Sequence, residues 1–181
     1  SPSRGLGDVY KRQFALTAVP VFSLFLTPLE SVVLSAALTL TSNLIGVRSY
    51  WGIVPLKPML PLVFMAVIGT AIGTMILVFI SPTQFQFWAG ISVIIACVVL
   101  IFFKPTIHRV NPMLTNFTGL LSGLMNGALA IPGPPMIIYV MLTEPVPERS
   151  RALLITFFLA SAVIALVSFG VAGFILSLIH I

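Results

Sequence analysis

A short stretch in the second half of the chain combines residue types that rarely occur together in an apolar run. It reads LMNGALAIPGPPMIIYVML, from Leu124 to Leu142, and it holds three prolines and two glycines. Proline removes a backbone donor and glycine loosens a helix, so the run predicts a helix that is broken at residues 131–135. In hydrocarbon, such a break survives only where protein or a water-filled cavity covers it. The pattern therefore predicts either a packing kink or the lining of a binding site.

The chemistry that such a break supports is anion binding. A helix N-terminus carries roughly +0.5 charge and free amide donors, and the first usable donors after this break belong to Met136 and Ile137. Pro134 and Pro135 suit a first helical turn, but they lack N–H groups and so reduce the number of donors. Polar side chains on the preceding helix and on other helices could complete the site. The candidate substrate-binding residues are Ser42, Asn43, Ser122, Asn126, Gly133, Pro134, Pro135, Met136, Arg151 and Ser161.

Some of these candidates have an alternative interpretation. Arg151 could attract an oxyanion to the cytoplasmic mouth of a pathway, or it could snorkel to the interface as a topology signal. Gly119, Gly123 and Gly127 are spaced four apart and could serve close helix packing alone. The two candidate asparagines favour a functional role, since an amide in hydrocarbon needs a partner.

Residues suited to catalysis or metal binding are sparse. Cys97 lies within an apolar span, no acidic residue lies inside one, and this lone cysteine has no partner for a disulfide or a metal ion. His108 lies beside Lys104 and Arg109, which favours a solvated basic residue over a proton relay. Tyr139 is expected to be an interfacial anchor, because its ring is apolar and its hydroxyl is polar. The sequence therefore predicts no enzyme, no catalytic residue, no metal site and no cofactor.

The elements that must position the candidate residues are membrane helices. The chain is 59% hydrophobic and 7% charged, which is far too apolar for a soluble domain of 181 residues. Its charges lie between apolar runs, so we expect an all-α polytopic helical bundle whose surroundings are the lipid bilayer. Gly69-x-x-x-Gly73 predicts a face for close helix approach. The expected apolar segments are 14–26, which is too short to span, then 30–47, 60–80, 85–103, the broken segment 114–142, and 152–175.

Both ends of the chain carry the signature of a sequencing adapter. DVYKRQ, at residues 8–13, and LSLIHI, at residues 176–181, can be encoded by nucleotide strings that are reverse complements of each other. The string resembles the transposon end used to prepare sequencing libraries, and residues 3–7 fit the adjoining adapter. We therefore expect residues 1–13 and 176–181 to be translated artefact. Because several basic residues lie in the first of these segments, the net charge of +5 does not indicate a nucleic-acid partner.

A weak internal repeat accompanies the helical pattern. Both copies show a short apolar piece, a proline turn and a long helix. On this interpretation, residues 14–113 are the remainder of a first repeat half that lacks its first helix. Residues 114–175 are the start of a second half that lacks its last helices. The matched pairs include Pro28 with Pro147, Ser31 with Ser150, and Ser42 with Ser161.

Basic residues indicate an orientation. The loops at 48–57 and 104–109 are separated by two spans, so the positive-inside rule places both in the cytoplasm and residues 81–84 outside. If the loop with Arg149 and Arg151 is also cytoplasmic, residues 114–142 enter and leave on the same side as a re-entrant pair. The two halves are then inverted repeats, which is a common plan among transporters. We favour inversion.

The segment GLLSGLMNGALAIPGPPMIIYVMLTEPVPERSRALLITFFL, Gly119 to Leu159, resembles the second half of the TauE/SafE family of sulfite exporters and related permeases. The shared features are a glycine-rich helix that runs into a G-P-P element, a short apolar piece, and a helix with an arginine near its start. The stretch from Val19 to Val47 resembles the matching part of the first half. The sequence departs from the family at Ile131-Pro132, where family members often carry further glycine.

The resemblance implies a function. It implies a secondary transporter that moves small sulfur-containing anions, such as sulfite or organosulfonates, across the bacterial cytoplasmic membrane. Two alternatives stay open: a permease for an unrelated small organic anion, and a structural or assembly subunit of the membrane. A homo-oligomer is compatible with each of these. Embedded carboxylates or histidines, which a membrane enzyme would need, are absent from the spans of the sequence.

Overall fold

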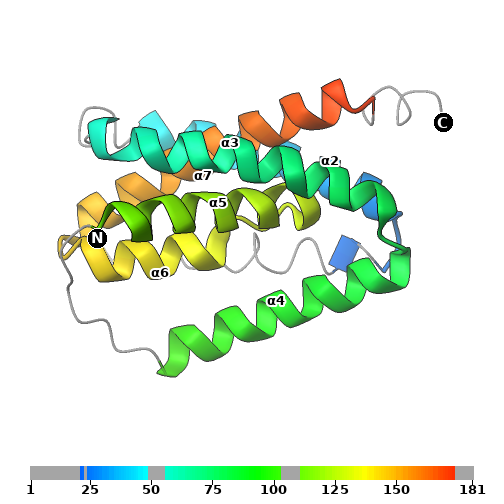
Figure 1. Ribbon diagram of the computed structural model, residues 1–181, viewed down its shortest axis with the longest axis horizontal. Helices are drawn as coiled ribbons and strands as arrows, with labels where there is room; N and C mark the ends of the chain where they lie inside the picture. Colours follow the sequence, from blue (N-terminus) through cyan, green and yellow to red (C-terminus); the bar gives the residue numbers. More distant parts are fainter. Residues whose placement is uncertain (1–20, 23, 49–55, 103–110, 174–181) are drawn as a thin grey trace.

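The computed structural model describes residues 21–22, 24–48, 56–102 and 111–173. The elements in these ranges are helical, which confirms the all-α class. Pro28–Gly46, Met59–Phe79 and Pro147–Val171 are long and apolar enough to cross a membrane. The predicted artefacts, most of the segment 14–26, and the loop with Lys104, His108 and Arg109 lie outside the described residues. The helices are α2 (Pro28–Val47), α3 (Leu56–Phe79), α4 (Pro82–Phe102), α5 (Pro112–Leu129), α6 (Gly133–Thr143) and α7 (Pro147–Val171) (Figure 1).

Local sequence explains where the helices begin. The Thr27 hydroxyl accepts from the Glu30 amide at 3.4 Å, and the Glu30 carboxylate accepts from the Thr27 amide at 2.9 Å. This reciprocal capping box starts α2, with a proline in its first turn. Asn111 caps α5 with its side-chain oxygen, which accepts from the Met113 amide at 3.0 Å. Prolines also occupy the first turns of α5 and α7, where a missing N–H costs nothing.

Helices α3 and α5 run parallel and approach so closely that only glycine fits between their backbones. A Cβ on Gly69 would lie 2.8 Å from the Leu124 nitrogen, and a Cβ on Gly123 would lie 2.7 Å from the Ala66 Cα. Real Cβ atoms essentially never come within 3.0 Å of such atoms. The predicted packing face at Gly69-x-x-x-Gly73 is therefore confirmed, as is the packing interpretation of the α5 glycines. The glycines of this interface are Gly69, Gly73, Gly119, Gly123 and Gly127.

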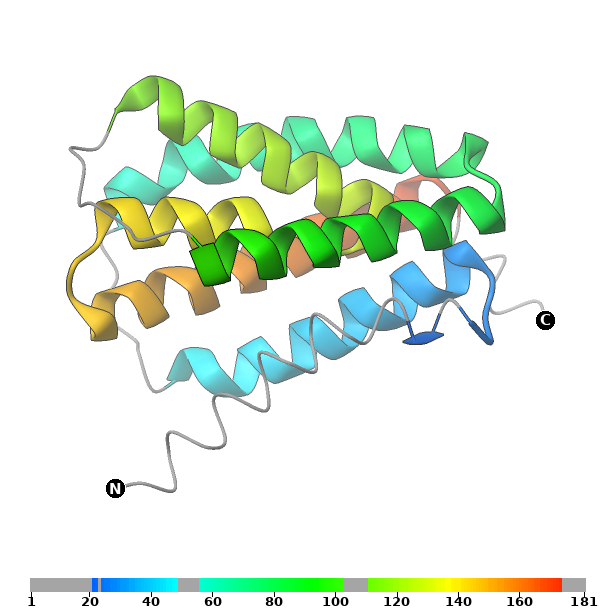
Figure 2. The ribbon, with the colours of Figure 1, turned by 90° about the horizontal axis from the view of Figure 1, so that it is seen from below.

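Helices α2 and α7 lie side by side and run in opposite directions (Figure 2). Gly46, near the end of α2, faces Ile155, near the start of α7. Val32, near the start of α2, shares a core cluster with Phe169, near the end of α7. Two helices that the predicted repeat relates are thus antiparallel, as inversion requires. The repeat itself stays a prediction.

Helix α4 lies at the edge of the bundle (Figure 1). Its first turns are anchored by Phe85 and Ala89, which are both 0% exposed and belong to the core cluster with Val32. Its last turn exposes Phe102 to 79%. Cys97 on this helix is exposed and carries a free thiol. An apolar helix face of this kind suits contact with lipid rather than water.

Helices α5 and α6 form an antiparallel hairpin whose turn lies within the bundle (Figure 1). Ala130 closes α5 in the left-handed conformation, with φ 53° and ψ 30°, and its amide donates to the Asn126 carbonyl at 2.9 Å. Helix α6 has 11 residues, about 16 Å in length, which is too short to span a bilayer core of about 30 Å. Because α5 and α6 are antiparallel, Pro112 at the start of α5 and Thr143 at the end of α6 lie at the same end of the bundle. A re-entrant pair would have this shape, although its place in a bilayer stays a prediction.

We expect Ala130→Gly to stabilise the protein by about 1 kcal/mol, because glycine enters the left-handed region without the Cβ clash that alanine suffers. Thermal unfolding of the detergent-purified protein measures the change. Ala128→Gly, in the last turn of α5, is the matched control, since loss of that methyl group from a regular helix costs about 1 kcal/mol. Equal destabilisation by both variants would show that Ala130 is not left-handed in solution.

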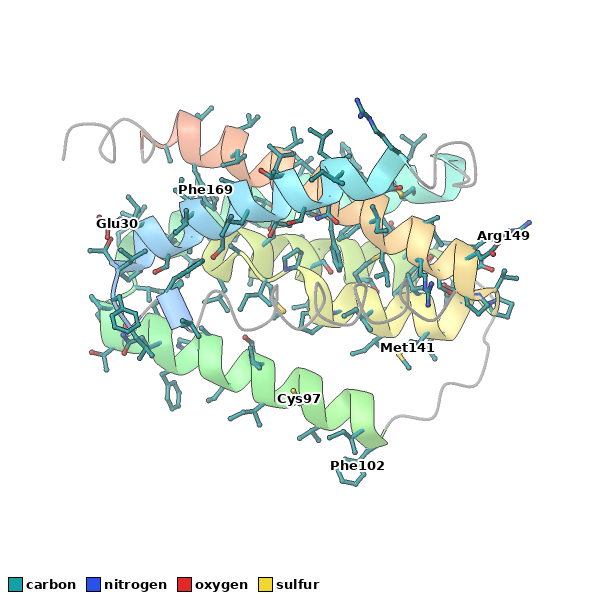
Figure 3. All side chains as sticks on the ribbon, turned by 180° about the vertical axis from the view of Figure 1, so that it is seen from behind. Glu30, Cys97, Phe102, Met141, Arg149 and Phe169 are labelled. Atoms are coloured by element: carbon teal, nitrogen blue, oxygen red, sulfur yellow. The ribbon has the colours of Figure 1, made fainter. Side chains whose placement is uncertain are left out.

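The charged residues gather at the ends of the bundle. Figure 3 shows Glu30 at one end and Arg149 at the opposite end. Arg48 ends α2 and Arg151 lies in the first turns of α7, so both share the end of Arg149. These three arginines thus lie on one side, and the positive-inside rule expects basic residues of one compartment to do so. Which compartment that is stays a prediction.

Candidate functional site

Buried polar side chains form a row through the apolar bundle. They lie on α3, α5 and α7, and the row is completed by Tyr139 on α6. Each of these residues is less than 9% exposed and is therefore buried inside the protein. Burying a polar group is unfavourable unless it finds a hydrogen-bond partner. The buried polar residues of these helices are Thr70, Thr74, Thr115, Thr118, Ser122, Asn126 and Ser161.

Asn126 is the centre of this row. Its side-chain nitrogen donates to the Ser161 carbonyl at 2.8 Å and to the Thr70 hydroxyl at 3.4 Å. One amide therefore joins α5 to both α7 and α3, although it is only 3% exposed. The glycines at positions 123 and 127 make this possible, because they bring the α5 backbone against α3. Asn126 thus lies where three helices meet, one turn before the break.

Ser122 and Tyr139 hold α6 against α5. The Ser122 hydroxyl donates to the Pro132 carbonyl at 3.0 Å, and this bond fixes the turn of the hairpin. Near the other end of α6, the Tyr139 hydroxyl lies 3.1 Å from the Thr115 hydroxyl. Tyr139 is 5% exposed, so the expectation that it anchors the protein at the interface is wrong. Its hydroxyl is satisfied inside the bundle instead, by a threonine on the neighbouring helix.

The N-terminus of α6 is poorer in donors than the sequence suggested. The helix begins at Gly133 with Pro132 as its N-cap, so Met136 is already its fourth residue. In a regular helix the amide at that position bonds to the N-cap carbonyl. Among the first three residues only Gly133 has an N–H, because Pro134 and Pro135 have none. The break therefore offers one free amide rather than the pair expected at Met136 and Ile137.

The structure brings together six of the predicted site residues. Three lie in the row and the others form the start of α6 beside it: Ser122, Asn126 and Ser161, then Gly133, Pro134 and Met136, all of them buried. Pro135 belongs to the same turn and is half-buried.

The remaining predicted residues lie elsewhere. Ser42 is exposed on α2, and the half-buried Asn43 donates to the Thr39 carbonyl of its own helix at 2.8 Å. Arg151 is exposed near the start of α7, about 15 Å along the helix axis from Ser161.

Sequence reasoning missed the two hydroxyl partners from α3 and α5, Thr70 and Thr115. Both are threonines, which are common in membrane helices and carry little signal alone. A signal existed for Thr70, since it lies between Gly69 and Gly73 and so on the face expected to pack closely.

The row of buried polar side chains is neutral, and the described residues hold no group of three or more His, Cys, Asp or Glu side chains that could bind a metal ion. Hydroxyls, one amide and one helix N-terminus suit a small polar or anionic ligand.

A family model described as "Sulfite exporter TauE/SafE" matches residues 14–180. The matched range contains every residue that the structure describes, including the glycine interface, the hairpin and the polar row. No curated protein and no solved structure matches the chain significantly.

Proposed function

Because the chain belongs to the TauE/SafE sulfite exporter family, which is a family of membrane transporters, we propose that it moves small sulfur-containing anions. Sulfite and organosulfonates are the proposed substrates, and the proposed site of action is the bacterial cytoplasmic membrane. We propose a secondary mechanism, in which two inverted halves expose one site alternately to the two sides. The helices that would belong to the two halves, α2 and α7, are antiparallel.

The observation that supports this proposal best is the neutral polar row at a broken helix. Asn126, Ser122 and Ser161 lie beside the N-terminus of α6 in an otherwise apolar bundle. A helix N-terminus and nearby hydroxyls can bind an oxyanion without a buried cationic side chain, whose placement in a membrane is costly. The proposed substrate site therefore comprises these three residues and the turn Gly133–Met136. A half-helix at mid-membrane is the usual element of such a site.

Arg151 has a separate role in this proposal. It is exposed and lies at the end of the bundle where Arg48 and Arg149 also lie. A cluster of positive charge at a pathway mouth raises the local concentration of an anion before it enters. We propose that Arg151 attracts the substrate there, while the polar row binds it further in.

Flux measurements on the full-length protein in proteoliposomes test the proposal. We expect sulfite or a short sulfonate to enter the vesicles, and Arg151→Gln to weaken the apparent affinity by about 0.2–1 kcal/mol, the scale for an exposed pair of opposite charges. Arg149→Gln is the matched control, because it removes the same charge two residues away. Equal losses of apparent affinity in both variants would show that the net positive charge at this end of the bundle attracts the anion, and that Arg151 has no specific role.

Other outcomes decide between the alternatives. Flux of a carboxylate, with no flux of sulfite or sulfonates, would show that the protein is a permease for another organic anion. The proposed substrate class would then be wrong. An absence of flux for every anion, with the protein folded and inserted, would favour a structural or assembly subunit.

A further inference from the structure

Several hydrogen-bond donors of the proposed substrate site are already paired within the protein. The Asn126 amide donates to the Ser161 carbonyl at 2.8 Å. The Ser122 hydroxyl donates to the Pro132 carbonyl at 3.0 Å. The Ser161 hydroxyl, in contrast, is buried at 2% exposure and has no hydrogen-bond partner. The Gly133 amide, at the start of α6, donates in none of the backbone hydrogen bonds described for the turns. One hydroxyl and one amide are therefore available to a ligand.

These two free donors lie at the same level of the bundle. Helices α6 and α7 are joined by residues 144–146 and run in opposite directions (Figure 1). Met136 of α6 and Phe157 of α7 are both fully buried and belong to one core cluster. Gly133 lies about one turn before Met136, and Ser161 about one turn after Phe157. Because the helices are antiparallel, both steps lead toward the same place.

The charged groups of the neighbouring helices lie away from these donors. Except for one tyrosine, the charged or titratable residues of α7 and of the helices packed on it lie in the first two turns or at the ends of their helices. Even Arg151, on the same helix as Ser161, is about 15 Å away along the axis. An ion at the polar row would therefore be solvated by neutral groups. These charged or titratable residues are Glu30, Arg48, Lys57, Tyr139, Glu144, Glu148, Arg149 and Arg151.

From this arrangement we propose that the polar row admits anions with a single negative charge and rejects dianions. The inference rests on the proposed transport function and specifies the charge of its substrate. The cost of moving an ion out of water grows with the square of its charge, so a dianion costs about four times as much as a monoanion. Each anionic oxygen that loses water also needs a donor. A free hydroxyl, a free amide and a helix terminus with roughly +0.5 charge suit one negative charge.

This selectivity has a particular meaning for sulfite. Organosulfonates carry a single charge throughout the neutral pH range, whereas sulfite takes up a proton in that range and becomes hydrogen sulfite. On this proposal the transported species is hydrogen sulfite, and every molecule that crosses takes one proton with it. Tyr139 is the titratable residue of the row, and its hydroxyl is paired with Thr115. The proton therefore travels on the substrate rather than on a side chain of the row.

Anion binding to the detergent-purified, full-length protein, measured by calorimetry at constant ionic strength and several pH values, tests the proposal. The probes are methanesulfonate, which keeps one charge, and sulfite and methylphosphonate, which change from one charge to two as the pH rises. We expect the affinity for methanesulfonate to stay constant. The affinity for total sulfite and for methylphosphonate should fall about tenfold for each pH unit above the titration of the probe, because one proton enters with the anion. The methanesulfonate series also detects any titration of the protein itself.

A serine variant tests the hydroxyl donor. Ser161→Ala should weaken methanesulfonate binding about tenfold, the effect of one lost hydrogen bond to a charged ligand. Ser35→Ala is the matched control, because the Ser35 hydroxyl is also buried, at 3% exposure, and also lacks a partner. Ser35 belongs to α2 and lies nearer the Glu30 end of the bundle than Ser161 does, since α2 and α7 are antiparallel. We expect Ser35→Ala to bind methanesulfonate as the parent does.

The contradicting results differ from those for the proposed function. Dianionic methylphosphonate that binds as tightly as methanesulfonate, or an affinity for total sulfite that does not change with pH, would overturn the charge selectivity and leave the transport proposal standing. Parent-like binding by Ser161→Ala would remove the role of that serine, and the pH series decides the selectivity even if this variant fails to fold. The predicted charge preference without flux of any anion in proteoliposomes would support the selectivity and overturn transport. No binding of any sulfur anion would overturn both.

Discussion

Gly123→Ala should destabilise the full-length protein by about 3 kcal/mol, the upper end for overpacking, because backbone and not a flexible side chain opposes the new methyl group. The added Cβ would lie 2.7 Å from the Ala66 Cα and 2.8 Å from the Ala66 carbonyl carbon. Helices α3 and α5 must separate to admit it. That separation also draws Asn126 away from Thr70, which it contacts at 3.4 Å, so transport should fall with stability.

Gly90→Ala is the matched control for this prediction. Gly90 lies on α4, and nothing comes within 4 Å of a Cβ placed there. Alanine in a helix interior is favoured over glycine by about 0.5–1 kcal/mol, so this variant should be neutral or slightly more stable. Denaturant unfolding in detergent micelles gives both values. A Gly123→Ala protein as stable as the parent would show that α3 and α5 are not in backbone contact.

Asn126→Leu should reduce transport by about 10- to 100-fold, the equivalent of losing one hydrogen bond to a charged ligand. Leucine has a similar volume but cannot donate, so the bonds to Ser161 and Thr70 disappear together. The Ser161 carbonyl retains the acceptor role that a regular helix gives it. The change in unfolding free energy should therefore stay near 1 kcal/mol, much smaller than the effect on transport.

Asn43→Leu provides the comparison that makes this result specific. Asn43 is also an asparagine within a span, but its amide donates to Thr39 of its own helix at 2.8 Å. We expect it to keep most of the transport rate. The measurement is anion flux into proteoliposomes at matched protein content, with unfolding followed on the same samples. If Asn43→Leu is as inactive as Asn126→Leu, the three-helix junction is not the substrate site.

Much of the fold followed from local chemistry in the sequence. The expected spans 30–47, 60–80, 85–103 and 152–175 agree with α2, α3, α4 and α7 to within a few residues, since charges and prolines mark helix ends in lipid. The glycine face of α3 was also predicted. The helix that packs on this face was not predicted. The spacing of small residues shows that a helix face packs closely, but it does not show which helix packs on it. The structure pairs α3 with α5 and leaves α4, its neighbour in sequence, at the edge.

The residues of the candidate site were predictable only where the chemistry of a side chain allows a single structural role in a membrane helix. Asn126 was identified because a buried amide must find a partner, and the structure provides two. Ser42 and Ser161 were treated alike because the repeat relates them, yet the former is exposed and the latter is 2% exposed. Equivalent positions in a repeat differ in burial when different helices cover them. That information is tertiary, and a sequence pattern with period 3.6 does not contain it.

The parallel pairing of α3 with α5 has a consequence for synthesis. Asn126 and its contact Thr70 are 56 residues apart, so at 5–20 residues per second α3 waits about 3–11 seconds in the membrane before α5 is made. During that interval its glycine face meets lipid or the small-residue face of any other nascent helix. Since α4 does not cover this face, the glycine face of α3 has no partner among the helices made before α5. Faster elongation through 80–130 shortens the interval, and crowding by other glycine-rich helices makes it more hazardous.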